Sequence, residues 1–465
     1  MKKQYIVLFG MLIIAACSTY RGLPSPVGNT SWRTKTLPAT PQNGTGDADA
    51  GLAYLIYGDY IGSGVPYEFM KNRLLDKPDV ILKREGLNAN AQYMLNVFEA
   101  SNGVNVVSGN CFTCHASWFE GKMVIGLGNS FSDYRKSLLT AARVLHAGMN
   151  VKYSKKSKEY QAYEDFGHYF QAMAPHIVTN QPGGNPAFRL AEACMNYRNP
   201  SDLTYREKPN YEIPDYPIAT DVPPLWHVKK KNALYYTGVG RGDFSKLLFQ
   251  ASVLGIPDSS AARKAVNNFK DVVAWLQTLE PPRYSKPIDQ PLAAKGEALF
   301  SEHCSGCHGT YGSQETYPNK LVSLDLVKTD PLYAAYGMQS GIVAWYNSSW
   351  FAQSEPRSWF VPDTGYVAPP LDGIWMSAPY LHNGSVPTLD DLLNSPQRPV
   401  YWSRTGESTD YDYEKVGWLY ERLDKPKGNW TFDTTLPGYT NKGHYFGDKL
   451  SDDERKAVIE YLKTL

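Results

Sequence analysis

The 465-residue sequence has little cysteine, little histidine and no surplus of charge of either sign. Its 47 basic and 46 acidic residues give a net charge of +1, which does not indicate a nucleic-acid partner or an acidic surface. The composition excludes intrinsic disorder, because 42% of the residues are hydrophobic and only 20% are charged. The length allows two or three domains with an ample buried core.

The first 16 residues have the pattern of a secretory signal peptide. Two lysines precede an apolar run over residues 5–16, which is too short to span a bilayer. The run ends in Ile-Ala-Ala before Cys17, which resembles the bacterial lipobox. That resemblance implies cleavage before Cys17, lipidation of its thiol and, because Ser18 follows, an outer-membrane lipoprotein facing the periplasm or the cell surface. The alternative is a plain signal peptide followed by an incidental cysteine.

Two short segments repeat the pattern Cys-x-x-Cys-His, which is the attachment signature of a c-type haem. The two thiols add to the porphyrin vinyl groups, and the histidine on the same helix face supplies an axial nitrogen to iron. A redox disulfide or half a zinc site would also contain Cys-x-x-Cys, but no further cysteine pair completes four zinc ligands. The predicted haem residues are Cys111, Cys114, His115, Cys304, Cys307 and His308. Cys194 is left over and is interpreted as a buried apolar residue.

An internal repeat connects the two halves of the chain. Each half contains one haem motif and closes with an apolar helix, over residues 259–279 and again after Ser451, which with Glu454 forms a capping-box pattern. A further helix is expected over residues 89–99. This repeat predicts a mainly α fold of two tandem cytochrome c-type haem domains with long irregular loops, in which the first and last helices of each domain cross.

Composition also predicts the domain boundaries. Residues 17–50 are rich in Thr, Pro, Gly, Asn and Ser, and are expected to be a flexible tether. The proline-rich run 281–291 is the natural boundary between domains. The prediction is therefore an N-terminal haem domain over residues 51–284 and a C-terminal haem domain over residues 285–465.

Residues 90–465 resemble the bacterial dihaem cytochrome c peroxidase superfamily. The strongest local match is the run Pro-Tyr-Leu-His-Asn-Gly-Ser at 379–385. The two haem motifs and the two closing helices also match this superfamily. Other segments are more similar to haem-dependent rubber oxygenases and their relatives: Gly-Leu-Gly-Asn at 126–129 and the runs 224–231, 240–244 and 443–447. Rubber oxygenases of this type are considerably longer, so the resemblance supports the architecture better than the substrate.

The sixth iron ligands decide what each haem can do. In the peroxidases the second haem takes a methionine about one helix after the Pro-Tyr-x-His segment, but here Asn-Ser-Pro at 394–396 offers no ligating side chain. His444 matches the region from which the rubber-oxygenase-like group supplies a second histidine, and we expect it to be the ligand. His382 is the main alternative, followed by Met376 and Tyr380.

For the first haem no sixth ligand is obvious, so we expect this haem to be five-coordinate and reactive. His146, His168, His176 and His227 are candidates on composition alone, and each is more often a structural histidine than a ligand. Trp226 resembles the tryptophan that lies between the haems in this superfamily, where it relays an electron or a hole. Its alternative role is simple packing against porphyrin.

Three further groups of residues are weighed for the haem surroundings. Arg241 and the run Lys229–Lys231 are expected either to pair with haem propionates or to be solvated charges. Gln171, His176 and Glu192 are candidates for an acid–base group that helps to break the O–O bond.

The predicted function is a dihaem oxidoreductase that activates peroxide or dioxygen at the N-terminal haem and relays electrons through the C-terminal haem. The partners would be a small-molecule oxidant and an electron donor or organic substrate, with a membrane reached through the lipid anchor. The alternative is a lipid-anchored dihaem electron carrier without enzymatic activity. Calcium is left open as an additional cofactor.

Overall fold

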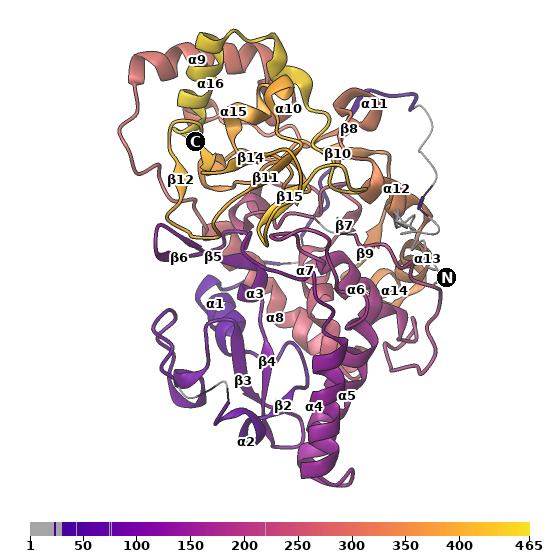
Figure 1. The fold of residues 1–465 in the computed structure, drawn as a ribbon. Helices are drawn as coiled ribbons and strands as arrows, with labels where there is room; N and C mark the ends of the chain where they lie inside the picture. The colour runs from indigo at the N-terminus through magenta and orange to yellow at the C-terminus, as the bar shows by residue number, and fades with distance from the viewer. Residues whose placement is uncertain (1–22, 25–29, 43, 74, 76, 219) are drawn as a thin grey trace, which may run out of the picture.

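The computed structural model describes residues 23–24, 30–42, 44–73, 75, 77–218 and 220–465. The signal peptide and Cys17 lie outside these residues. Helix makes up 40% and strand 14% of the structure, in a mixed α/β arrangement with several small sheets. The predicted mainly α fold of tandem cytochrome c domains is therefore wrong, because short extended segments pair with one another in both halves of the chain (Figure 1).

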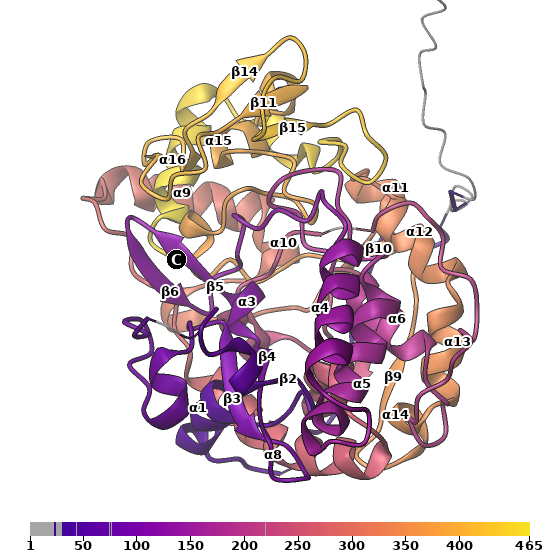
Figure 2. The same cartoon turned by 60° about the horizontal axis from the view of Figure 1, so that its bottom comes forward.

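The helices of the N-terminal half surround the first haem motif, and α4, α5 and α6 lie side by side on one flank (Figure 2). The α-helices of this half are α1 Ala48–Tyr57, α2 Tyr67–Met70, α3 Phe112–His115, α4 Leu139–Lys152, α5 Lys158–Met173, α6 Ala187–Asn196, α7 Phe244–Phe249 and α8 Ser259–Thr278. The 3-10 helices are η1 Gly86–Asn90, η2 Leu225–Lys230 and η3 Gln250–Gly255.

The C-terminal half begins with α9, which leads directly into the second haem motif. Its α-helices are α9 Gln290–His303, α10 Ser305–His308, α11 Leu324–Val327, α12 Leu332–Gln339, α13 Gly341–Ser348, α14 Trp350–Gln353, α15 Leu389–Leu392 and α16 Asp452–Leu462. Its 3-10 helices are η4 Gly312–Gln314, η5 Ile374–Met376, η6 Ser395–Gln397 and η7 Tyr445–Lys449. The capping box expected at Ser451 and Glu454 is confirmed at the start of α16.

All strands pair in antiparallel fashion, in sheets of two or three strands. The strands are β1 Thr34–Thr36, β2 Val65–Pro66, β3 Leu95–Glu99, β4 Asn105–Gly109, β5 Ala116–Phe119, β6 Lys122–Ile125, β7 Gly240–Gly242, β8 Lys320–Ser323, β9 Ser358–Phe360, β10 Gly365–Val367, β11 Tyr401–Ser403, β12 Tyr411–Asp412, β13 Gly417–Trp418, β14 Glu421–Leu423 and β15 Thr431–Asp433. The helix expected over residues 89–99 is wrong, because β3 forms a hairpin with β4 instead.

In each half, one helix pair crosses at a glycine. A Cβ on Gly51 of α1 would overlap the carbonyl oxygen of Asp271 in α8, and a Cβ on Gly296 of α9 would overlap that of Ala457 in α16. Only glycine lets the two backbones approach this closely. Each half thus contains one close helix crossing, although the surrounding structure is not purely helical.

Two strand pairings join segments that are far apart in sequence. β1 pairs with β8, so residues 34–36 of the predicted tether are held against the C-terminal half. β7 pairs with β9 across the predicted boundary at residues 284 and 285. No helix among the described residues is long and apolar enough to cross a membrane.

Candidate haem sites

The second Cys-x-x-Cys-His segment forms α10, which turns directly away from the end of α9. Gly309 ends this turn with a φ of 82°, and a Cβ there would overlap the carbonyl oxygen of Thr316. The Nδ1 atom of His308 lies 2.9 Å from the carbonyl oxygen of Pro369. Such a bond fixes Nδ1 as the protonated nitrogen and leaves Nε2 free for a metal.

His444 faces His308 across an apolar cavity. The centroids of the two imidazole rings are 6.2 Å apart. Two imidazoles that bind one metal from opposite sides, with metal–nitrogen bonds of about 2 Å, place their ring centroids roughly 6 Å apart. Burial, followed by the charge of the nearby His308, lowers the pKa of His444 to about 3, so the ring is neutral and can donate an electron pair.

The loop that carries His444 is held by a buried arginine. Arg398 uses all five of its N–H donors on backbone carbonyls, at distances of 2.6–3.3 Å. The accepting carbonyls belong to Asp391, Leu392, Asn441, Gly443 and His444. Gly443 has a φ of 83°, and a Cβ there would overlap the backbone nitrogen of Thr329. Sequence reasoning missed this role of Arg398, because nothing in the local sequence marks it.

The cavity between His308 and His444 fits a large apolar macrocycle with an acidic edge. Its apolar lining includes Leu299, Phe300, Val322, Leu392, Leu450, Val458 and Leu462. The thiols of Cys304 and Cys307 also line it, without a disulfide. Lys231 lines the same cavity and has no ion-pair partner among the described residues, and its burial lowers its pKa to about 8. A half-buried ammonium without an ion-pair partner is a group that a haem propionate would satisfy.

The alternative ligands of the second site have different surroundings. His382 also lines the cavity, but its ring stacks on Tyr366 with centroids 4.2 Å apart. Tyr380 donates its hydroxyl to the carbonyls of Ile374 and Val416, both at 3.2 Å. Met376 is buried in the cluster around Trp375. The geometry therefore favours His444, and its ligand role stays a prediction.

The first Cys-x-x-Cys-His segment forms α3 and is positioned by side chains of the preceding hairpin. Asn110 accepts a hydrogen bond from the Phe112 amide at 2.9 Å, and Tyr60 accepts one from the Cys111 amide at 3.2 Å. The Asn110 amide group in turn donates to Asn96 at 2.8 Å. These contacts fix the start of α3.

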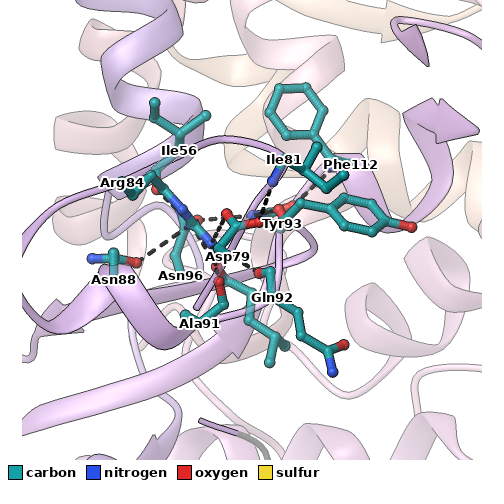
Figure 3. A network of polar contacts seen from close by, with 12 residues as sticks. Ile56, Asp79, Ile81, Arg84, Asn88, Ala91, Gln92, Tyr93, Asn96 and Phe112 are labelled. Atoms are coloured by element: carbon teal, nitrogen blue, oxygen red, sulfur yellow. Dashed lines mark hydrogen bonds and ion pairs between the residues drawn. The ribbon is translucent and has the colours of Figure 1, made fainter. Parts of the chain in front are cut away.

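A buried ion pair of Arg84 and Asp79 lies next to Asn96 (Figure 3). Arg84 donates to the side-chain oxygen of Asn96 at 3.2 Å and lies 3.3 Å from the carboxylate of Asp79. It also donates to the backbone carbonyls of Ile56, Leu95, Ala91 and Gln92. The network therefore connects α1, η1 and β3 to the first haem motif, and sequence reasoning missed it.

His115 lies at the end of α3 in a buried environment. Burial lowers its pKa to about 4, which leaves the imidazole neutral. The amide of Gly126 donates to its backbone carbonyl at 2.8 Å. Within the described residues, no second histidine ring is in contact with the ring of His115, in contrast to His308.

Three of the candidate sixth ligands at the first site have other partners. His146 lies 3.4 Å from the hydroxyl of Tyr163, and His168 stacks on Tyr205 with centroids 4.6 Å apart. The Nε2 atom of His227 lies 2.9 Å from the carbonyl oxygen of Asp372.

The three acid–base candidates differ in the partners of their side chains. Glu192 is buried in an ion pair with Arg189 at 2.5 Å and also accepts the hydroxyl of Tyr336. Gln171 donates to the Gly167 carbonyl within α5. His176 is half-buried, and burial followed by the charge of Arg189 lowers its pKa, which favours the neutral form of the ring.

Trp226 lies between the two halves and is fully buried. Its ring packs against two glycines: a Cβ added to Gly126 would lie 3.4 Å from the ring, and a Cβ added to Gly373 would lie 3.2 Å from it. The amide of Gly126 donates a hydrogen bond to the backbone carbonyl of His115. The Nε1 of Trp226 donates to the carbonyl of Asp372 at 2.8 Å. The position between the two haem motifs agrees with a relay but also with packing alone.

The basic run next to Trp226 has divided roles. Lys229 pairs with Glu280, and Lys230 pairs with Asp372 at 2.5 Å and with Glu315. Only Lys231 of this run lines the haem cavity. Arg241 is buried with one guanidinium nitrogen unpartnered, and burial lowers its pKa.

Comparison with known proteins supports a cytochrome c relationship. Residues 365–403, which run from β10 to β11 and include His382, match the RoxA-like, cytochrome c-like family. That match implies covalently bound haem c in a rubber-oxygenase-like relationship.

Two relatives come from Sinorhizobium fredii, and both are uncharacterised proteins. The protein y4iJ is 32% identical over 253 residues, covering 40% of this chain and 41% of y4iJ. The protein y4iM is 27% identical over 307 residues, covering 57% of this chain and 69% of y4iM. The chain thus spans about two fifths of y4iJ and about two thirds of y4iM.

The described side chains give no support for a calcium site. Among the described residues, no group of three or more histidine, cysteine, aspartate or glutamate side chains is arranged to hold a metal ion.

Proposed function

We propose that the chain is a dihaem c-type oxidoreductase whose first haem reacts with peroxide or dioxygen while the second stores or relays electrons. The asymmetry of the two sites carries the proposal. His444 opposes His308 at 6.2 Å, whereas no described histidine opposes His115. An iron closed on both faces moves electrons, and an open iron can bind an oxygen species.

The residues of this chain have separate tasks in the proposal. Cys111 and Cys114 hold one haem and Cys304 and Cys307 the other, by thioether bonds. His115, His308 and His444 give axial nitrogens, for which burial keeps their imidazoles neutral. When bound, the haem iron supplies the redox chemistry. Lys231 neutralises a propionate of the second haem, and Trp226 relays electrons between the sites.

His176 is the proposed proton acceptor near the first haem. The amide of Thr179, three residues later, donates to the Tyr134 carbonyl at 3.0 Å, and the Tyr134 hydroxyl contacts the Cys114 thiol. This connection through Tyr134 supports a position of the loop after α5 near the first attachment site. A ring that is neutral at pH 7 can take a proton from a bound peroxide and return it to the departing oxygen.

The substrate, the partners and the location belong to the same proposal. The RoxA-like match favours a small oxidant together with an organic substrate or an electron donor. We also propose that Cys17 is lipidated and anchors the protein to the outer membrane. Palmitate labelling of the full chain should be lost in the Cys17→Ser variant; labelling that persists would contradict the anchor.

Low-temperature EPR of the air-exposed holoprotein, with an optical spectrum beside it, tests the function. One high-spin and one low-spin ferric signal are expected, and only the high-spin signal should change on addition of hydrogen peroxide. A low-spin pair that becomes partly high-spin on half-reduction would indicate a peroxidase that needs reductive activation. Two low-spin signals that peroxide and half-reduction leave unchanged would contradict the proposal and leave the electron carrier.

A further inference from the structure

A chain of buried aromatic rings leads from Trp226 to the surface. Trp226 packs on Gly373 and belongs to the same buried cluster as Trp375, two residues further on. The ring of Trp375 meets that of Tyr284 edge-on with centroids 5.2 Å apart, and Tyr284 lies 5.9 Å from Tyr413. Tyr411, whose hydroxyl is bonded to the Trp375 carbonyl, gives a second branch and lies 5.2 Å from Tyr413.

The hydroxyl partners distinguish the tyrosines of this chain of rings. Tyr284 donates to the backbone carbonyl of Tyr413 at 2.7 Å, and Tyr411 donates to that of Trp375. A backbone carbonyl accepts a hydrogen bond but cannot take the proton. Tyr413 instead donates to the carboxylate of Glu120, which can take it. Among these three tyrosines, only Tyr413 can therefore lose an electron and a proton together.

Glu120 lies at the tip of the hairpin that begins directly after His115. It has a φ of 48° at the turn between β5 and β6, and its amide donates to the Ser408 carbonyl at 2.9 Å. Figure 1 shows this hairpin next to β12, which leads into Tyr413. Tyr413 and Glu120 are both partly or fully exposed. The first haem motif and the end of the aromatic chain thus meet at one accessible point.

We propose an electron relay that carries electrons from the protein surface to an over-oxidised haem site. It consists of Trp226, Trp375, Tyr284, Tyr411 and Tyr413, with Tyr413 as its terminus at the surface. This rests on the proposed function, because hydrogen peroxide at the first haem is the oxidant. Tyr413 gives one electron to the relay and its phenolic proton to Glu120. Because one Tyr413 gives only one electron, the Tyr413 side chains of two molecules together supply the two electrons that reduce one hydrogen peroxide. Glu120 passes each phenolic proton to solvent, and solvent supplies the two protons that complete the two waters. Two Tyr413 radicals from separate molecules can then join as dityrosine.

The test adds one equivalent of hydrogen peroxide to the holoprotein without a reducing substrate. Rapid-freeze EPR reports the radical, the optical spectrum reports the haem, and peptide mass spectrometry locates dityrosine. The expected result is a tyrosyl radical and dityrosine at Tyr413. Both should be lost in Tyr413→Phe, which keeps the ring, and most of the radical yield should be lost in Glu120→Gln, which keeps a hydrogen-bond acceptor but not the base.

Tyr420→Phe is the matched control, because Tyr420 also donates to a carboxylate, Asp391 at 3.1 Å, but lies in a different aromatic cluster. It should leave the radical unchanged. A haem spectrum that changes with peroxide while Tyr413 stays unmodified would overturn the relay alone. A haem spectrum that does not respond to peroxide would overturn the proposed function and the relay with it. A radical that persists in Tyr413→Phe would also overturn the relay.

Discussion

The two haem motifs are built on different supports. The second ends a helix pair and opens into a cavity where His444 faces His308 at 6.2 Å. The first follows the β3–β4 hairpin and is fixed by Asn110 and the ion pair of Arg84 with Asp79, without a facing histidine among the described residues. The comparison teaches that the same five-residue signature is compatible with different surroundings on the side that faces it, because the signature supplies residues for only one face of a haem.

The largest expected effect comes from removing each attachment pair in turn. Cys304→Ser with Cys307→Ser should halve the covalent haem content, Cys111→Ser with Cys114→Ser should by itself also halve it, and the four changes together should leave no covalent haem. The pyridine haemochrome assay of purified protein measures this. Cys194→Ser is the control and should leave both haems in place, since its buried thiol contacts the sulfur of Met173 and belongs to neither Cys-x-x-Cys-His motif. Unchanged haem content in either double variant would show that its cysteine pair does not attach a haem.

His444→Ala sharpens the comparison by making the second site resemble the first. We expect the low-spin ferric signal of the second haem to be replaced by a high-spin one, because one axial nitrogen is lost. EPR of the holoprotein measures the change. His382→Ala is the matched control and should leave the spin state unaltered; a spin change in that variant alone would assign the ligand to His382.

Arg84→Met breaks the support of the first site only. Its carboxylate partner Asp79 would remain buried and unpaired, so we expect a loss of about 3–5 kcal/mol in the free energy of unfolding. Urea unfolding measures the loss. In the folded variant, the optical spectrum of the second haem should be unchanged. Arg135→Met removes a more exposed ion pair with Asp133 and should cost less than about 1 kcal/mol. Equal losses in the two variants would contradict the role of the network.

The smallest effect concerns the pH dependence of the segment between the sites. Burial lowers the pKa of His227 to about 3, below its unfolded value of about 6.5. The unfolded chain therefore binds a proton that the folded chain does not, and the free energy of unfolding falls as pH decreases from about 6.5 toward 3. His227→Gln should reduce this slope by roughly 1 kcal/mol per pH unit in urea titrations between pH 6 and 4.5. An unaltered slope would contradict the burial of a neutral ring.

The sequence was informative where a local pattern carries the chemistry. The two Cys-x-x-Cys-His segments, the cap at Ser451 and the helix that begins at Ser259 could all be predicted, because each depends on residues within one or two turns. The pairing of β3 with β4 could have been suspected from Asn102-Gly103, a turn pair between apolar runs. The apolar spacing of Leu95, Val97 and Phe98 was read as helical instead.

Contacts across long sequence distances could not be predicted. Arg398 reaches the His444 loop, Lys231 reaches the cavity of the second haem, and β1 pairs with β8, all through packing that one sequence does not encode locally. The mainly α prediction failed for the same reason. Short strands of two to five residues gain their stability from a partner strand, so they leave little periodicity to detect.

The five carbonyls on Arg398 have a consequence for ligand exchange. If His444 is the axial ligand that we propose for the second haem, moving it away would release Arg398 donors while the guanidinium stays buried. The loop would therefore leave only as a unit, and the second haem should keep the same axial pair when it is oxidised or reduced. Its electron transfers then require little nuclear rearrangement, which is the property that suits a haem for fast exchange with a reactive neighbour.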